Sequence, residues 1–491
     1  MTTRFEIHPA IGIARVGSSP TWFIGPEPGE PGPARYRDEH GALLRQAARF
    51  RVYECQRDAD GTLVAARETG AGAADITWTV HLVNRKAASA GFLGALRNPE
   101  ETDRERLVID PGPRSVSGPG GTARLGGGRF RNTSVPLGEI VIDSDGRLCV
   151  AGGSGRAGSE PQTGIEHFAN NDNWWDDTSD GPVSAVVHTP DGTEHDAVPA
   201  WVIVAPPDFA PPILNFVTLY DVALDAAVAR GWRRIPPRPS FTRDVYPILA
   251  RPYGYSWVTE LAVREHRAWG PTSSRWARLA DPDGDADDRH RLLSALRKPG
   301  DPAASGRMPR LNDDTEKNVL PPSATQYEIL TRWAAGEFIG DWGSATGPDE
   351  PVPDALDRVA LQAGSGGAFF PGIEASSVLA DPVSYREAYR LDPGVLAPGS
   401  VTEGCALPWQ ADFIACRQQN GRGWWPSQRP DHVHRDPTDV DGRLVPWARG
   451  VTGAAGMVAS WDRLGVVVER PGPAGRPVFV EAERLLPEPA D

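Results

Sequence analysis

The stretch from residue 139 to residue 150, EIVIDSDGRLCV, predicts a β-hairpin and with it the β-rich character of the first part of the chain. Residues 139–142 read as one strand, the run Asp-Ser-Asp-Gly at 143–146 as a tight turn, and residues 147–150 as the returning strand. Four further stretches alternate or run apolar as strands do: 50–53, 76–83, 183–187 and 200–204. Residues 1–212 are therefore predicted to form a β-rich N-terminal domain.

Helical patterns begin just after this region. The segments 214–230 and 326–338 place apolar residues at helical intervals, and a glycine stands at or near the end of each. The segments 276–322 and 343–356 are rich in Asp, Pro and Gly, a composition that predicts loops. We therefore expect an α+β fold class, in which residues 213–491 form a catalytic domain of mixed helices and irregular chain.

The composition excludes several classes of function. The 491 residues include 51 Lys and Arg against 65 Asp and Glu, and a net charge of -14 disfavours nucleic acid and anionic lipid as partners. We find no long uncharged apolar run that would span a membrane and no secretory signal, so a cytoplasmic location is the default and signal-free export stays open. Four cysteines are too few for a disulfide scaffold in a chain of this length. A small-molecule ligand is the better expectation.

The residues best suited to carry chemistry gather in one stretch, GCALPWQADFIACRQQNGRGWWPSQRPD, at 404–431. Asp412 and Cys416 are four residues apart, so on a helical turn they share a face. Trp424 and Trp425 follow eight and nine residues after Cys416. Spacing alone leaves a structural role open, because a buried Cys is usually a small hydrophobe and Trp pairs usually pack in cores.

Longer strings of sequence narrow this choice. They are IGIARVG at 11–17, FIGPE at 23–27, RQAARFR at 45–51, VHLVNRK at 80–86, NND at 170–172 with SDGPV at 179–183, APPDFAP at 205–211, FPGIE at 370–374 and PWQAD at 408–412. In this order they resemble the LodA/GoxA-like family of quinoprotein amino-acid oxidases, and the resemblance runs over nearly the whole chain. It implies a cysteine tryptophylquinone, a thioether-linked Cys and oxidised Trp.

The resemblance also assigns residues to this cofactor. The family's D-x-x-x-C pattern falls on Asp412 and Cys416, and its aromatic-Trp-Pro pattern places the quinone on Trp425, with Trp424 as the second choice. An ortho-quinone supplies the electron sink that oxidation of a primary amine requires, while the protein supplies orientation and bases. Asp412 is the expected general base, because burial among Trp409 and its aromatic neighbours would raise its pKa toward neutrality.

Other candidates are weighed beside this set. Tyr220, Trp409 and His432 could line the pocket, although a Tyr on a helix is more often a core residue. His432 and His434 alternate, yet no third ligand is near in sequence, so we predict no metal site and regard surface exposure as the simplest account. The Asn- and Asp-rich run 170–180 lacks the final Glu of an EF-hand loop, and turn or capping roles explain it better.

The resemblance implies an oxidase of the EC 1.4.3 type that deaminates an amino acid or primary amine with dioxygen, releasing ammonia and hydrogen peroxide. It also implies a homo-oligomer and a separate flavoprotein that helps to mature the quinone. The chain is shorter than well-known members and its Cys-to-Trp loop is compact, so channel or subunit-contact elements could differ. Two alternatives stay open: the same cofactor with a specialised natural-product substrate or a non-oxygen acceptor, and a β-rich binding or scaffold protein that makes no quinone.

Overall fold

The computed structural model describes residues 2–59, 61–70, 75–91, 94–301, 308–309, 321–344, 350–366, 377–418, 428–440, 442–473 and 476–488, and only the backbone at 264, 377 and 415–418. Trp424 and Trp425 therefore lie outside the described residues, as does the side chain of Cys416. The string 370–374 lies outside them too.

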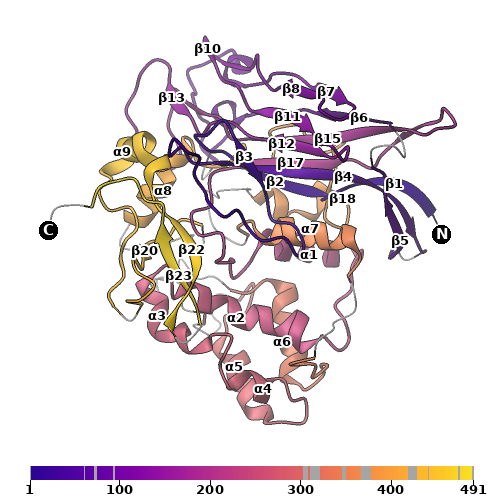
Figure 1. Cartoon of the computed structure of the whole chain (residues 1–491), viewed down its shortest axis with the longest axis vertical. Coiled ribbons are helices and arrows are strands. Elements are labelled where there is room, and N and C mark those ends of the chain that lie inside the picture. The colour runs from indigo at the N-terminus through magenta and orange to yellow at the C-terminus, as the bar shows by residue number, and fades with distance from the viewer. Residues whose placement is uncertain are drawn as a thin grey trace.

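One large sheet dominates the first part of the chain (Figure 1). Its 13 described strands are β1 (Thr2–His8), β2 (Ile11–Arg15), β3 (Trp22–Ile24), β4 (Arg45–Arg57), β5 (Leu63–Glu68), β6 (Asp75–Val80), β7 (Arg114–Ser117), β8 (Thr122–Arg124), β11 (Glu139–Ile142), β12 (Leu148–Ala151), β15 (Ser179–His188), β16 (Glu194–Asp196) and β17 (Ala200–Ala205). The main path runs β7-β6-β15-β17-β2-β4-β12-β11-β8. Its end strands β7 and β8 lie beside each other, so the sheet nearly closes.

The burial of these strands follows from their sequences. Every residue of β17 and of β2 is buried, and the two strands pair in parallel with Trp201 opposite Ile11. Strands buried on both faces are expected to be continuously apolar, as AWVIVA is. The predicted hairpin is confirmed: β11 and β12 pair antiparallel, with Ile140 opposite Val150. The β-rich prediction for this part of the chain is thus correct.

The helices come later in the chain. Those described are α1 (Leu219–Ala229), α2 (Tyr246–Tyr255), α3 (Glu260–His266), α4 (Arg275–Leu279), α5 (Ala286–Ala295), α6 (Ala324–Ala334), α7 (Val352–Gln362), α8 (Trp409–Gln418) and α9 (Gly453–Ser460). The two predicted helices are α1 and α6, and each begins with a capping box, Thr218 with Asp221 and Ser323 with Gln326. Gly336 follows α6 with φ of 81°, the left-handed conformation that ends many helices.

The prediction of loops at 276–322 and 343–356 is wrong in part. The first segment contains α5, where the side chain of Asp285 accepts hydrogen bonds from the backbone of Asp287 and Asp288. Its Asp-rich composition marks a helix start rather than a loop. The second segment ends inside α7, which begins at Val352 directly after a proline. Both errors arise because Asp and Pro favour helix N-termini as well as loops.

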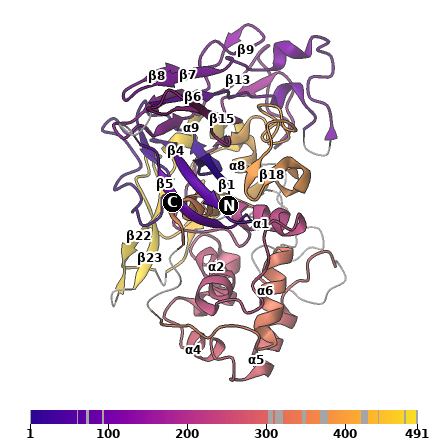
Figure 2. The same cartoon turned by 90° about the vertical axis from the view of Figure 1, so that its right-hand side faces the viewer.

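Helices α1 to α7 lie on one side of the sheet in two groups. Helices α1 and α7 lie directly beneath the sheet, and α2 to α6 lie farther from it (Figures 1 and 2). The last part of the chain, α8, α9 and the short strands β20 (His432–Val433), β21 (Val445–Pro446), β22 (Val466–Pro471) and β23 (Pro477–Ala482), packs alongside the sheet. The largest core cluster accordingly joins sheet residues such as Val204 to Phe413 and Val466. None of the described helices has the length and apolar character that crossing a bilayer requires.

Candidate functional site

The N-terminus of α8 is fixed by a buried ion pair. The backbone N–H of Trp409 donates to Oδ2 of Asp176 at 3.3 Å, and Nζ of Lys86 donates to the same oxygen at 2.9 Å. Lys86 also donates to the carbonyl of Ala406 at 3.1 Å. Lys86 is 2% exposed and Asp176 is not exposed at all, so loss of either partner would leave an uncompensated buried charge.

Arg97 holds the segment that leads into α8. This buried guanidinium donates to the carbonyls of Glu403 at 3.0 Å and Cys405 at 2.6 Å, and also to that of Ala169 at 3.1 Å. One residue into the helix, Nε2 of Gln410 donates to the carbonyl of Gly155 at 2.9 Å. The start of α8 is thus tied to two loops of the β-rich part of the chain.

One side of α8 carries the predicted catalytic positions. Positions 409, 412, 413 and 416 follow helical spacing and fall on the same side of the helix. Asp412 is 1% exposed, and Trp409 and Phe413 are buried as well. The expectation that Asp412 and Cys416 share a helical turn is therefore confirmed. The burial of Asp412 is also as predicted.

An aromatic wall covers this side of α8. The Phe413 ring lies 4.8 Å from that of Trp409 and 6.1 Å from that of Phe209, measured between ring centroids. Trp461 packs edge-on against Trp409 at 5.2 Å, and Trp447 lies 4.9 Å from Phe209. Such a wall excludes water, so charges inside it interact more strongly than they would at the surface. Asp412 is buried on the helix that carries two of these rings.

Several buried polar atoms around α8 have no hydrogen-bond partner among the described residues. They are Nε1 of Trp409, Oε1 of Gln410, and both Nε and Nη2 of Arg429. Buried polar atoms of folded proteins nearly always have partners, so these atoms are positions where a ligand, a modification or an ordered water supplies one. The donors among them suit oxygen acceptors, which an ortho-quinone and an amino-acid substrate both carry.

The chain on either side of Arg429 is hydrogen-bonded to two residues of this wall. The carbonyl of the preceding Gln428 accepts from the backbone N–H of Phe209 at 2.8 Å, and the carbonyl of Asp431 accepts from Trp447 at 3.0 Å. The Arg429 side chain is completely buried, and its Nη1 lies 3.3 Å from Oδ1 of Asp431. The segment after the predicted quinone position is therefore held by residues that contact α8.

Two acidic residues of the Asn- and Asp-rich run also lie close to this region. Burial, reinforced by the charge of Asp176, raises the pKa of Asp177 to about 7, although backbone hydrogen bonds oppose the shift. Burial raises the pKa of Asp180 to about 6, and this carboxylate accepts from Thr402 and from Nε1 of Trp201. The predicted turn and capping roles are therefore incomplete, because the Asp180 carboxylate connects the sheet to the segment before α8, while Asp177 is held by the loop at 154–156.

Tyr220 packs in a different cluster from Asp412. It stacks on Tyr389 with ring centroids 5.2 Å apart, and the two hydroxyl groups are 3.2 Å apart. Both belong to the core beneath β2 and β17, whereas Trp409 and Phe413 belong to the larger cluster. Tyr220 thus has the core environment that is usual for a helical tyrosine, and its place in the pocket remains a prediction.

The two histidines after the predicted quinone are not simply surface residues. His434 is 2% exposed, its ring lies 5.5 Å from that of Trp257, and its Nε2 lies 3.4 Å from Arg267. His432 is half-buried in β20, and its backbone N–H donates to the carbonyl of Val258 at 3.1 Å. The expectation of surface exposure is therefore wrong for His434. A pocket role for His432 remains a prediction.

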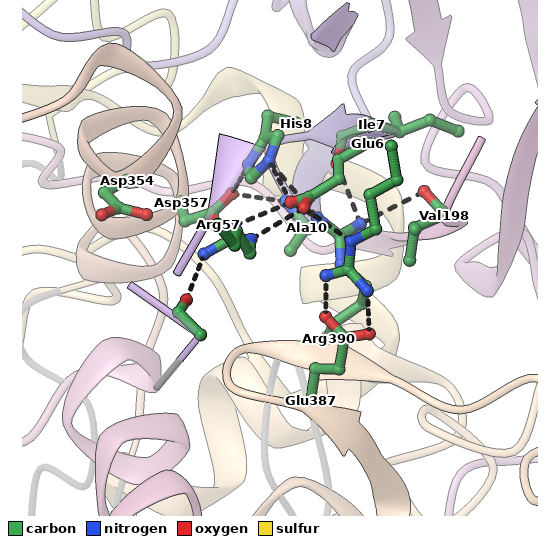
Figure 3. A network of polar contacts seen from close by, with 12 residues as sticks. Glu6, Ile7, His8, Ala10, Arg57, Val198, Asp354, Asp357, Glu387 and Arg390 are labelled. Atoms are coloured by element: carbon green, nitrogen blue, oxygen red, sulfur yellow. Dashed lines mark hydrogen bonds and ion pairs between the residues drawn. The ribbon is translucent and has the colours of Figure 1, made fainter. Parts of the chain in front are cut away.

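A second polar cluster lies far from α8 along the chain, where β1 meets α7 (Figure 3). Glu6, His8 and Cys55 bring possible metal-ligand atoms within 4.8 Å of one another. Glu6 already accepts two hydrogen bonds from Arg57, both at 2.7 Å, and Nδ1 of His8 lies 2.9 Å from Asp357. Because these ligand atoms are engaged with charged partners, we interpret the cluster as an ion-pair network rather than a metal centre.

Sequence reasoning missed the residues that anchor α8. The anchoring hydrogen bonds join residues that are 72 to 320 positions apart in the sequence, and local patterns do not reveal such pairs. They are made by Lys86, Arg97 and Asp176. A partial signal existed, because Lys86 ends one of the family-like strings and Asp176 lies in the Asn- and Asp-rich run. Arg429 gave no signal beyond its place in the 404–431 stretch.

Comparisons with known proteins match the chain along its length. A family model described as L-lysine epsilon oxidase N-terminal matches residues 8–204, and one described as the L-lysine epsilon oxidase C-terminal domain matches residues 302–436. L-lysine 6-oxidase from Marinomonas mediterranea is 27% identical, in an alignment that covers 98% of this chain and 89% of that protein.

Solved structures agree with this match. The structure of the epsilon-lysine oxidase from Marinomonas mediterranea has a TM-score of 0.80 at 25% identity and covers 98% of this chain and 95% of its own. The structure of the Schiff base intermediate of the L-Lys epsilon-oxidase from the same organism with L-Lys has the same score, identity and coverage. The architecture described above is thus the lysine-oxidase fold. The chain belongs to the L-lysine epsilon oxidase family, the LodA-like family that its sequence resembles.

Proposed function

We propose that this protein is a quinoprotein amino-acid oxidase whose cysteine tryptophylquinone forms between Cys416 and Trp425. The observation that carries the proposal is Asp412, which is 1% exposed on α8, one helical turn before Cys416, in a chain whose whole fold agrees with the lysine oxidases. The described surroundings fit such a cofactor, because the unpartnered indole N–H of the buried Trp409 suits an oxygen that the quinone carries.

When formed, the quinone supplies the electron sink for oxidation of a primary amine. The chain's own residues provide the rest. Asp412 takes the proton from the carbon that bears the amine, and its burial keeps bulk water away from the carboxylate. Water and dioxygen then complete the balance, so that an amino acid is converted to an oxo product, ammonia and hydrogen peroxide, which corresponds to the EC 1.4.3 type.

The first substrate to test is L-lysine, since it is the ligand of the Schiff base intermediate solved for the Marinomonas mediterranea enzyme. Glycine and simple primary amines are the next set. Peroxide production that equals oxygen consumption distinguishes an oxidase from an enzyme that passes electrons to another acceptor. Turnover with an artificial dye alone, without peroxide, would favour the non-oxygen acceptor and contradict the oxidase.

Cofactor formation has a direct test. A peptide map of residues 400–450 should contain a cross-link between Cys416 and Trp425, and the intact mass should differ from that of the plain chain. Cys416→Ala should remove both the mass change and the visible absorbance. A link to Trp424 would move the quinone by one residue. An unmodified wild-type chain, even after co-expression with a flavoprotein partner, would favour the scaffold alternative.

Two partner proposals belong to the same function. A flavoprotein should be needed for maturation, so expression without one should give chains that lack the cross-link in mass spectra. A homo-oligomer should elute from size-exclusion chromatography with a mass that is a multiple of 52.9 kDa. A colourless monomer that becomes coloured without any partner would contradict both proposals.

A further inference from the structure

One edge of the Arg429 guanidinium, formed by Nε and Nη2, has no hydrogen-bond acceptor among the described residues; we call it the open edge. Its side chain is completely buried, Nη1 lies beside Asp431, and both Nε and Nη2 lack a hydrogen-bond partner among the described residues. No other described side chain has two such atoms. A buried guanidinium with two unused donors is costly, so the arrangement is expected where a ligand completes it.

Other arginines of the chain indicate which group suits such an edge. Several other described arginines use the same Nε and Nη2 pair to hold one carboxylate with two hydrogen bonds, and three of them are part-buried pairs of the β-rich part of the chain. Arg57 holds Glu6 with both distances at 2.7 Å, and Arg147 holds Glu68 at 2.7 and 3.3 Å. Arg49 holds Glu27 in the same way. The side-on fork fits the two oxygens of a carboxylate, which is the strong and geometrically selective form of the contact.

The open edge belongs to the neighbourhood of α8. Residues 428 and 431, on either side of Arg429 in the chain, hydrogen-bond to the backbone of Phe209 and Trp447, and the Phe209 ring contacts that of Phe413. Phe413 is the residue directly after Asp412 on α8. A carboxylate on Arg429 would therefore lie in the same buried region as the proposed base.

We propose that Arg429 binds the carboxylate of the substrate, so that the enzyme takes amino acids in preference to simple amines. This proposal rests on the proposed function for the identity of the site, and it adds the group that selects the substrate class. Arg429 acts on the substrate by a bidentate contact, while Asp431 holds the opposite side of the guanidinium.

The test separates binding from oxidation. The full-length Cys416→Ser variant cannot form the cross-link, so titration calorimetry and thermal shift on it report binding alone. We expect L-lysine and glycine to bind, and L-lysinamide, pentane-1,5-diamine and methylamine to bind at least about tenfold more weakly, as loss of a charge-assisted bidentate contact implies. Equal binding of L-lysine and L-lysinamide would overturn the proposal without any change at Arg429.

Variants in the same background locate the effect. Arg429→Met should abolish the preference for the carboxylate, and Arg429→Lys should reduce it, because an ammonium keeps the charge but lacks the fork. Arg147→Met is the control, since Arg147 holds Glu68 through the same edge in the turn before β12, and it should keep the full preference. A preference that survives Arg429→Met would overturn the proposal.

The two proposals fail in different ways. If the wild-type intact mass shows no cross-link, the oxidase proposal fails, whatever the ligands do. If the cross-link is present but ligands with and without a carboxylate bind alike, only the role of Arg429 fails. Where Arg429→Met does not fold, as judged by circular dichroism, the comparison of L-lysine with L-lysinamide on the Cys416→Ser chain still decides.

Discussion

Asp412 owes its proposed role to where α8 places it. The carboxyl group is buried on the side of the helix that also carries Trp409 and Phe413, one turn before the position of Cys416. Asp412→Asn keeps the size of the side chain but cannot accept a proton. We expect the rate of amino-acid oxidation to fall about 10²- to 10⁴-fold, the usual contribution of a general base. Initial rates of peroxide formation per mole of cross-linked protein would measure it.

The control for this prediction retains the carboxyl group. Asp412→Glu should preserve a measurable fraction of the rate, whereas Asp412→Asn should also leave part of the chains without the cross-link in mass spectra. Normal activity in Asp412→Asn would remove this residue from the mechanism. Normal maturation with a lost rate would limit its role to catalysis.

Residues of the site differ in how far sequence reveals them. Asp412 and Cys416 are evident because a four-residue spacing within one helix is a local pattern. Arg429 is not evident, because its significance is the absence of partners on one edge of its guanidinium, which only a folded structure can show. The predicted surface exposure of His434 is wrong because its burial beside Trp257 depends on packing between distant segments, which local sequence does not reveal.

At the scale of elements, α8 depends on anchors outside itself. Lys86 neutralises Asp176, whose carboxylate accepts the first backbone N–H of the helix. Lys86→Met leaves Asp176 buried without its counter-charge, and removal of one partner of a buried pair typically costs about 3–5 kcal/mol. We therefore expect the free energy of unfolding, measured by urea denaturation, to fall by an amount in that range.

The double variant Lys86→Met with Asp176→Asn is the matched control. It removes both charges, so it should be less destabilised than Lys86→Met alone. Because α8 carries Asp412, the single variant should also mature less completely than the double variant. Equal stability of Lys86→Met and the wild type would mean that this pair does not hold the helix.

Elements themselves are predictable where pattern and burial agree. The predictions of the β11–β12 hairpin and of the buried strand β17 are correct, because alternating and continuous apolar patterns follow directly from burial. The prediction of a loop is wrong around α5, because Asp285 caps a helix while the residues beside it resemble a turn. The order of strands in the sheet could not be predicted, since the pairing of β17 with β2 joins segments nearly 200 residues apart.

At the scale of the whole molecule, a charged network joins the first strand to elements that come more than 340 residues later in the chain. Glu6 and His8 come from β1, Asp357 from α7, and Arg390 from β19 (Arg390–Leu391) (Figure 3). Nδ1 of His8 lies 2.9 Å from Asp357 and its Nε2 lies 3.2 Å from Glu6. Arg390 donates to the carbonyl of Ile7 at 2.9 Å. The network therefore couples the N-terminal strand to elements late in the chain.

This network should make the free energy of unfolding depend on pH, because the pKa values of His8 and Glu6 differ between the folded and the unfolded chain. Burial would lower the pKa of His8, but the charge and hydrogen bond of Asp357 outweigh it and raise the pKa to about 10. Burial would raise the pKa of Glu6, but the hydrogen bonds of Arg57 and His8 hold it far below its usual range. The stabilisation by His8 is thus complete below its ordinary pKa of 6.5 and is lost as the pH rises toward 10. That of Glu6 is complete above 4.5 and is lost in acid.

The contribution of this network should therefore be greatest between about pH 4.5 and 6.5, the ordinary values for the two groups. Above that window one proton separates the folded from the unfolded state at His8, so the free energy of unfolding should fall by about 1.4 kcal/mol for each pH unit. Denaturation of the wild type and of His8→Gln at pH 6, 7.5 and 9 would measure it. The difference between the two proteins should shrink as the pH rises, because His8 loses the charge that the variant lacks at every pH. A constant difference across this range would mean that His8 is held neutral between its two carboxylates.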